Sequence, residues 1–250
     1  MEQDVIDRIG AVRREVRTCE RDGAPARAVV AERTFDTTVD DVWDAITNPE
    51  RLPRWFLPVE GDLELGGRYQ LIGNAGGEVT TCDPPAHLAV TWEFGEAVTW
   101  LDVHLSDDGD GKTRLRLEHV APVDDSGHWD QFGPGAVGIG WDLGLLGLTE
   151  YIRTGEQVTV DADGTADGAG PEFMARSSDA WCEADIASGT PEAEARRRAA
   201  ATTAAYTGAP EGESPEPGGS PESPESPDAS GGASASPEGG APVGGGEPAG

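Results

Sequence analysis

Hydrophobic positions in the middle of the chain alternate with polar ones, which is the pattern of half-buried β-strands. The first such run is Arg27–Phe35, and the last follows the DDGDGK turn at residues 107–112. The alternating positions after the first run are Leu63, Leu65, Tyr69 and Leu71, then Leu88, Val90, Trp92 and Phe94, then Leu101, Val103 and Leu105, and finally Leu115, Leu117 and His119. Because short turns separate these runs, they predict an antiparallel meander with one apolar face and one solvated face.

The stretch TTVDDVWDAITNPERLPRWF, residues 37–56, interrupts the alternation directly after the first predicted strand. Thr37 or Thr38 can cap a helix that begins at Val39. The Asn48-Pro49 pair ends that helix, because the residue before a proline resists the helical region. A second short helix follows and carries Leu52, Trp55 and Phe56.

Helical spacing also marks both ends of the predicted sheet. Residues 4–18 place Val5, Ile6, Ile9, Val12 and Val16 three and four positions apart, which predicts an amphipathic helix. Residues 129–152 predict a long helix, with Val137, Trp141, Leu145, Leu148 and Ile152 on one face. A helical pair is expected at residues 173–186 and 191–206, docked on the core because its weakly apolar helices would be marginal alone.

These patterns divide the chain into four segments. Residues 1–22 are expected to form the N-terminal amphipathic helix, residues 26–155 the sheet domain and residues 156–207 a helical extension. Residues 208–250 are rich in Gly, Pro, Ser, Ala and Glu and carry eight acidic residues and no basic one. This tail cannot bury enough apolar surface to offset the entropy of ordering, so it is expected to be disordered.

The charge and the cysteine content narrow the possible partners and surroundings. A net charge of −29 repels phosphate backbones and anionic lipid surfaces, so neither nucleic acid nor a membrane is an expected partner. The three cysteines Cys19, Cys82 and Cys182 share no CxxC spacing, so neither a disulfide framework nor a zinc site is expected. No apolar signal segment or membrane span is present in the sequence, and a cytoplasmic location is expected.

The order of the elements resembles the helix-grip, START-like fold, which is α+β and wraps an antiparallel β-sheet on a long C-terminal helix. The segments TFDTTVDDVWDAITNPERLPRWF, LELGGRYQL, LAVTWEF, TRLRLEHVA and GWDLGLLGLTEYI are similar to those of the SRPBCC superfamily. Within it, they most resemble bacterial proteins related to the C-terminal domain of Aha-type activators of a heat-shock chaperone ATPase. The resemblance covers residues 27–153, so the helical extension and the tail lie outside it.

The resemblance implies a cavity between the concave face of the sheet and the long helix. The candidate wall residues are Trp92, Phe94, Leu101, Val103, Leu117, Trp129, Phe132, Trp141 and Leu145. Apolar residues on a sheet face and a helix face are core residues first, so each of them could be an ordinary core residue. Arg68 and Tyr69 lie where such folds often place a polar group at the cavity mouth, and a one-residue register shift would exchange their faces.

His119 is the one polar residue in phase with the inward positions of its strand. With an ordinary pKa of about 6.5 it could act as an acid or base, or it could be a buried histidine satisfied by a neighbour. His104 shares its phase with Trp100 and Asp102 and is expected to be solvated. His87 and His128 have no partner at ligand spacing, so neither a metal nor a cofactor is expected.

Sequence motifs of other enzyme classes fail their context. Residues 133–138 match GxGxxG formally, but no parallel strand precedes them and Pro134 occupies the turn, so a nucleotide cradle is not expected. Their simpler role is a cap where the loop enters the long helix, and one hypothesis is that this cap gates the cavity. Gly140 and Gly144 would suit close packing of that helix on the sheet. No HExxH, P-loop or GxSxG motif occurs.

Three functions follow as hypotheses. The first is a non-catalytic module that holds a hydrophobic small molecule in the cavity. The second is a cyclase- or hydratase-type enzyme that uses the same cavity with His119 as its acid or base. The third is a protein-interaction module, by analogy with the chaperone activators.

Overall fold

An eight-stranded antiparallel sheet organises the computed structural model, which describes residues 7–124, 127–158 and 170–208. The strands are β1 (Arg13–Arg21), β2 (Ala24–Phe35), β3 (Val59–Gly61), β4 (Arg68–Leu71), β5 (Gly76–Asp83), β6 (His87–Phe94), β7 (Ala97–Gly109) and β8 (Lys112–Pro122). The helices are α2 (Val39–Thr47), the 3-10 turn η1 (Leu52–Arg54), α3 (His128–Phe132), α4 (Gly135–Thr154), α5 (Gly170–Ala187) and α6 (Glu192–Thr207). This is the α+β class predicted from the sequence.

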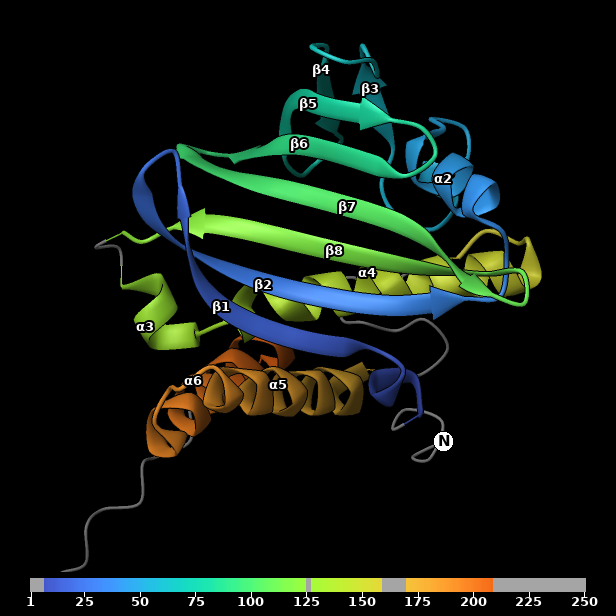
Figure 1. Cartoon of the computed structure of the whole chain (residues 1–250). Coiled ribbons are helices and arrows are strands. Elements are labelled where there is room, and N and C mark those ends of the chain that lie inside the picture. The colour runs from blue at the N-terminus through green and yellow to red at the C-terminus, as the bar shows by residue number, and fades with distance from the viewer. Residues whose placement is uncertain (1–6, 125–126, 159–169, 209–250) are drawn as a thin grey trace, which may run out of the picture. The chain divides into compact units, whose positions relative to one another are not determined.

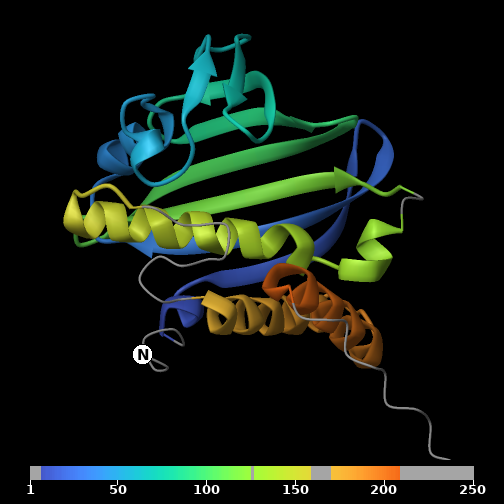
Figure 2. The ribbon, with the colours of Figure 1, turned by 180° about the vertical axis from the view of Figure 1, so that it is seen from behind.

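The strand order is β1-β2-β8-β7-β6-β5-β4-β3, and every neighbouring pair is antiparallel. β2 pairs with β8, whereas the next strand, β3, lies at the opposite edge of the sheet. The segment with α2 and η1 therefore connects the two ends of the strand order. α4 runs along one face of the sheet, whereas the other face of β6, β7 and β8 has no helix over it (Figures 1 and 2). The sheet therefore has a face that packs on α4 and an outer face.

The insertion between β2 and β3 forms as its residues predict. Thr38 caps α2, where its hydroxyl accepts a hydrogen bond from the Asp41 amide, and the helix begins at Val39. Asn48 ends it with extended backbone before Pro49. Trp55 then lies in the core, and its indole N–H donates to the Ala45 carbonyl at 2.9 Å. This bond ties the end of η1 to α2.

The predicted helix over residues 4–18 is wrong, because Arg13–Arg21 is strand β1 and only residues 7–10 are helical in the part described. Val12 and Val16 are both buried and four residues apart. Since four is an even number, that spacing suits a strand as well as a helix. The inward position between them is Arg14, whose charge hides the period of two.

The predicted long helix over residues 129–152 is divided. α3 ends at Gly133, which has φ 60°, and Pro134 precedes the first turn of α4. A left-handed φ is available to glycine without strain, so the chain can turn sharply here. α3 is thereby separated from the helix that covers the sheet.

The two predicted C-terminal helices are present as α5 and α6, and α5 packs on both α4 and β1. Trp181 of α5 is fully buried against α4 at Gly138. A Cβ added to Gly138 would lie 2.2 Å from the Trp181 ring, so only glycine allows this approach. The glycine-rich start of α4 is thus the surface on which α5 packs.

The division into segments 1–22, 26–155, 156–207 and 208–250 stays a prediction, and the expected disorder of the tail concerns residues outside those described, apart from Gly208. Among the described residues, no helix is both long and apolar enough to cross a membrane.

Candidate functional site

An apolar cavity of about 170 Å³ lies between the inner face of the sheet, α4 and the α2–η1 insertion. Its lining comes from α2, η1 and the segment after it, from six strands, from the connection between β3 and β4, and from α4. The residues are Ile46, Thr47, Leu52, Trp55, Phe56, Val59, Leu63, Tyr69, Leu71, Val79, Cys82, Leu88, Val90, Trp92, Leu101, Val103, Leu115, Leu117, Trp141, Gly144, Leu145 and Leu148. With so few polar groups on its wall, the cavity suits an apolar occupant.

Six of the ten candidate site residues lie on this wall: Trp92, Leu101, Val103, Leu117, Trp141 and Leu145. They come from β6, β7, β8 and α4, and the period of two on the strands and of three to four on the helix placed them on the right faces. Whether they bind a ligand stays a prediction.

The other four candidates do not line the cavity. Phe94 ends β6 at a tight hairpin and is 63% exposed. Trp129 and Phe132 lie on α3, which the Gly133 turn separates from α4, and Trp129 packs under the Arg27 guanidinium at 5.1 Å. His119 is buried beside the wall, with Trp92 and Trp141 near its ring.

His119 is satisfied through both of its ring nitrogens. The Trp141 indole N–H donates to Nδ1 at 3.0 Å, so the proton of the neutral ring is on Nε2, which lies 2.7 Å from the Thr99 hydroxyl. That hydroxyl donates onward to the Trp92 carbonyl at 3.1 Å. This chain of hydrogen bonds orients the Trp141 indole, ends on the Trp92 backbone carbonyl and leaves no imidazole nitrogen for acid–base work. The interpretation as a buried, satisfied histidine therefore fits the geometry.

Burial lowers the pKa of His119 to about 4 from an ordinary value of 6.5. Protonation of His119 is therefore easier in the unfolded chain than in the folded one. The contribution of His119 to the free energy of unfolding is fully present above pH 6.5 and is lost as the pH falls toward 4. A shift of this size corresponds to about 3 kcal/mol at most. We expect the free energy of unfolding, measured with urea at several pH values, to fall across this range.

The matched variant for this prediction is His119→Gln, which keeps a polar side chain but cannot titrate. Its unfolding free energy should fall less steeply between pH 6.5 and 4 than that of the unaltered chain. Identical slopes in the two proteins would assign the acid sensitivity to other groups.

The register at Arg68 and Tyr69 is settled. Tyr69 points inward to the cavity, and its hydroxyl donates to the Thr91 carbonyl at 2.8 Å. Burial raises the pKa of this phenol. Arg68 lies outside and pairs with Glu93 at 2.6 Å. The polar group at this part of the cavity is therefore a neutral tyrosine that is already bonded to backbone.

Gly144 is one of the wall residues that were not among the ten candidates. It lies on the cavity face of α4, and a Cβ there would meet only the Phe56 ring, at 3.7 Å. The expectation that Gly140 and Gly144 pack on the sheet is wrong, because Gly140 is exposed and faces the Tyr206 hydroxyl. Because Gly144 has no side chain, the space between α4 and the sheet stays open at this position.

The GxGxxG-like segment of residues 133–138 packs on the helical extension. Added Cβ atoms would meet Arg198 at Gly133, Thr202 at Gly135 and Trp181 at Gly138. These glycines serve helix packing, and no cavity residue belongs to the segment. The hypothesis that it gates the cavity finds no support in these contacts.

A buried ion pair joins α4 to the edge strand β1. Arg14 of β1 reaches Asp142 of α4 through Nη2 at 3.0 Å and Nε at 3.1 Å, and both side chains are almost fully buried. Trp181 and Ser177 of α5 donate to the same carboxylate oxygen. Burial raises the pKa of the Asp142 carboxyl, while Arg14 and these hydrogen bonds oppose that change.

Residues 36–153 match the family model described as Activator of Hsp90 ATPase homolog 1-like protein. The mouse (Mus musculus) Activator of 90 kDa heat shock protein ATPase homolog 1 is 23% identical over 134 residues, which cover 45% of this chain and 39% of the mouse protein. The chain thus spans about two fifths of the length of that relative.

Among solved structures, CalU16 from Micromonospora echinospora is 29% identical to this chain. Its solution structure matches with a TM-score of 0.59 and covers 72% of this chain and 97% of CalU16. Its crystal structure matches with a TM-score of 0.55 and covers 70% of this chain and 98% of CalU16. Together with the family match, these similarities confirm the START-like resemblance.

Proposed function

We propose that residues 36–153, an Activator of Hsp90 ATPase homolog 1-like domain with the START-like fold, hold one small apolar molecule between α4 and the sheet. The observation that supports this proposal is the cavity of about 170 Å³ with its almost wholly apolar wall. Dry apolar cavities of about 150 Å³ accept a molecule the size of benzene. The proposed occupant is therefore on the scale of a single hydrophobic ring or a short branched chain.

Two features favour binding without catalysis. The ring nitrogens of His119 are both engaged, and the ring lies behind Trp92 and Trp141. Tyr69, at the wall, donates its hydroxyl proton to a backbone carbonyl and has a raised pKa. A cyclase or hydratase would need an acid or base that can reach the substrate, and neither residue is poised to act as one. We place this binding role in the cytoplasm.

A second candidate function is association with an Hsp90-class chaperone. It is favoured by the family match and by the name of the mouse relative, a heat-shock protein ATPase activator. Since this chain spans only 39% of that relative, its activity is not carried over beyond this proposal.

The two candidates can be separated by native mass spectrometry of the full chain purified from its own host. We expect a stoichiometric additional mass that denaturing extraction releases as an apolar small molecule. The same chain is then mixed with a purified Hsp90-class chaperone, and a defined complex would support the second candidate. If the chain carries no additional mass, binds no apolar probe when titrated and forms no complex, both proposals are contradicted.

A further inference from the structure

Three metal-ligating side chains meet on the outer face of the sheet, opposite the cavity. His87 Nε2 lies 2.6 Å from Asp102 Oδ1, and His104 Nε2 lies 3.5 Å from the same oxygen. The imidazole rings are stacked, with centroids 4.0 Å apart and planes 15° from parallel. The sequence left His87 without a partner, and that prediction is wrong.

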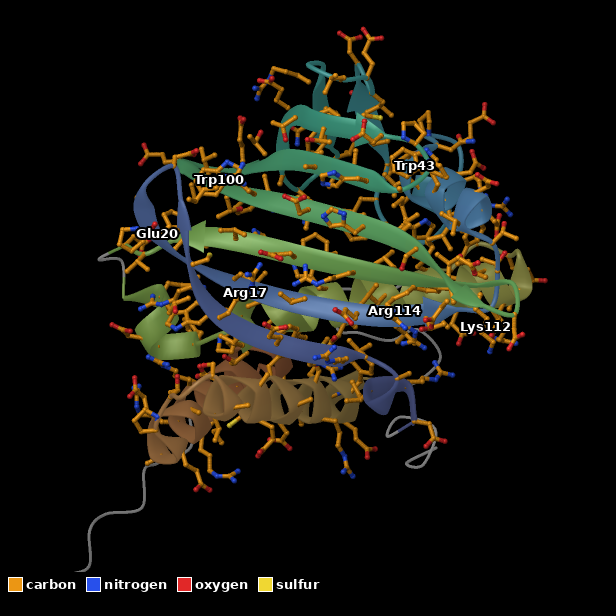
Figure 3. The ribbon with its side chains drawn as sticks, viewed as in Figure 1. Arg17, Glu20, Trp43, Trp100, Lys112 and Arg114 are labelled. Atoms are coloured by element: carbon orange, nitrogen blue, oxygen red, sulfur yellow. The ribbon has the colours of Figure 1, made fainter. Side chains whose placement is uncertain are left out.

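The strand register brings the three residues together. His87 of β6 pairs directly with His104 of β7, so the two side chains share a face. Asp102 precedes His104 by two positions and therefore points the same way. Trp100 is the next residue on that face. In Figure 3 it lies on the side of the sheet away from α4, as do Arg17 and Arg114.

The spacing of the donor atoms fits a small transition ion. One donor atom from each of the three side chains can be chosen so that all lie within 4.8 Å of one another. In a tetrahedral site with ligands about 2.0–2.2 Å from zinc, the donor atoms are about 3.3 Å apart. The separations of 2.6 and 3.5 Å between Asp102 Oδ1 and the two histidine Nε2 atoms bracket this value.

The cluster resembles a ligand set more than an ordinary ion pair. Both Nε2 atoms lie near a single carboxylate oxygen, His87 at hydrogen-bond distance and His104 at 3.5 Å.

A charged neighbour of the cluster on the adjacent strand is an arginine that is held in ion pairs. Arg116 of β8 lies across from His104, and its guanidinium pairs with Glu32 at 3.2 Å and Glu118 at 2.7 Å. The same two carboxylates also pair with Arg13 and Arg17, so three guanidiniums share them. The Asp102 carboxylate interacts with the two imidazoles.

We propose that His87, Asp102 and His104 bind one divalent transition-metal ion of the zinc class, with solvent completing its coordination. Two imidazoles and a carboxylate suit zinc, and the half-exposed side chain of His104 leaves the site open to water. The metal would join β6 to β7 directly behind the cavity wall, because Leu88 and Val103 alternate with the ligands and line that wall. The proposal does not depend on the cavity being occupied.

The test is a titration of the full chain with zinc chloride in a non-chelating buffer, measured by isothermal calorimetry. We expect one saturable site that is weakened at least about ten-fold in His87→Ala, since even partners outside the ligand shell act on that scale. Asp102→Asn, which keeps the shape of the side chain, should weaken it in the same way. His128→Ala is the matched control, since it removes a histidine from α3 and should leave the affinity unchanged.

Circular dichroism of each variant establishes that it is folded before its titration is interpreted. A folded His87→Ala or Asp102→Asn protein that binds zinc as tightly as the unaltered chain would overturn the proposal and assign the binding to surface carboxylates. An unaltered chain that takes up no zinc would overturn it too.

Discussion

Replacing Arg14 by methionine is expected to lower the free energy of unfolding by about 3–5 kcal/mol, because Asp142 is left as an unpaired buried charge. The Asp142 side chain is 1% exposed and that of Arg14 is 6% exposed, so water cannot replace the lost partner. The pair joins β1 to α4, and Trp181 and Ser177 add bonds from α5 to the same carboxylate. Urea unfolding at pH 7 measures the effect.

The double variant Arg14→Met with Asp142→Leu is the control for this prediction. Replacing both members of a buried ion pair by apolar side chains is often close to neutral. The double variant should therefore recover most of the stability that the single variant loses. A single variant as stable as the unaltered chain would show that the pair does not hold α4 in place.

Replacing Gly144 by leucine is expected to abolish the binding of small apolar probes while leaving the fold intact. The new side chain projects from the cavity face of α4, and its Cβ meets only the Phe56 ring, at an ordinary contact distance of 3.7 Å. Removing a glycine from the helix interior favours the helix by up to about 1 kcal/mol. Loss of binding with unchanged or greater stability, measured by calorimetry and urea unfolding, is the signature of a filled cavity.

Gly140→Leu is the matched control, since it makes the same exchange on the same helix. Gly140 is exposed, and its nearest neighbour would be the Tyr206 hydroxyl, at 3.9 Å from an added Cβ. This variant should keep its affinity for the probe. Equal binding by the Gly144→Leu and Gly140→Leu proteins would show that the probe does not enter the cavity.

The fold was predictable where local rules and tertiary packing agree. The Thr38 cap, the Asn48-Pro49 break and the alternation of Leu101 and Val103 with polar neighbours are short-range signals, and the structure follows them. β1 was not predictable in this way, because its inward position at Arg14 is occupied by a charge. The carboxylate that pairs with that charge is Asp142, which lies 128 residues away.

The candidate site shows the same limit. Periodicity placed Trp92 and Trp141 on the correct faces, but it could not show that Gly133 turns α3 and Phe132 away from the sheet. Periodicity also could not show that Gly144 leaves space on the cavity wall, because that depends on which residues surround it in the folded chain.

The contacts of the histidines depend on strand pairing, which the sequence pattern does not specify. His87 and His104 are 17 positions apart in the chain, and the β6–β7 register makes them direct neighbours. His119 was correctly placed in phase with Leu117, but its bonds to Thr99 and Trp141 come from two other elements.

The central claim is that the cavity accepts a small apolar molecule, and methyl NMR of the unaltered full chain during a benzene titration tests it most directly. We predict saturable shifts confined to wall methyl groups such as those of Leu88, Val103 and Leu145. Saturable shifts at these methyls would establish binding at the proposed site. Wall methyls that do not move at the solubility limit of benzene, or shifts spread evenly over the surface, would contradict the claim.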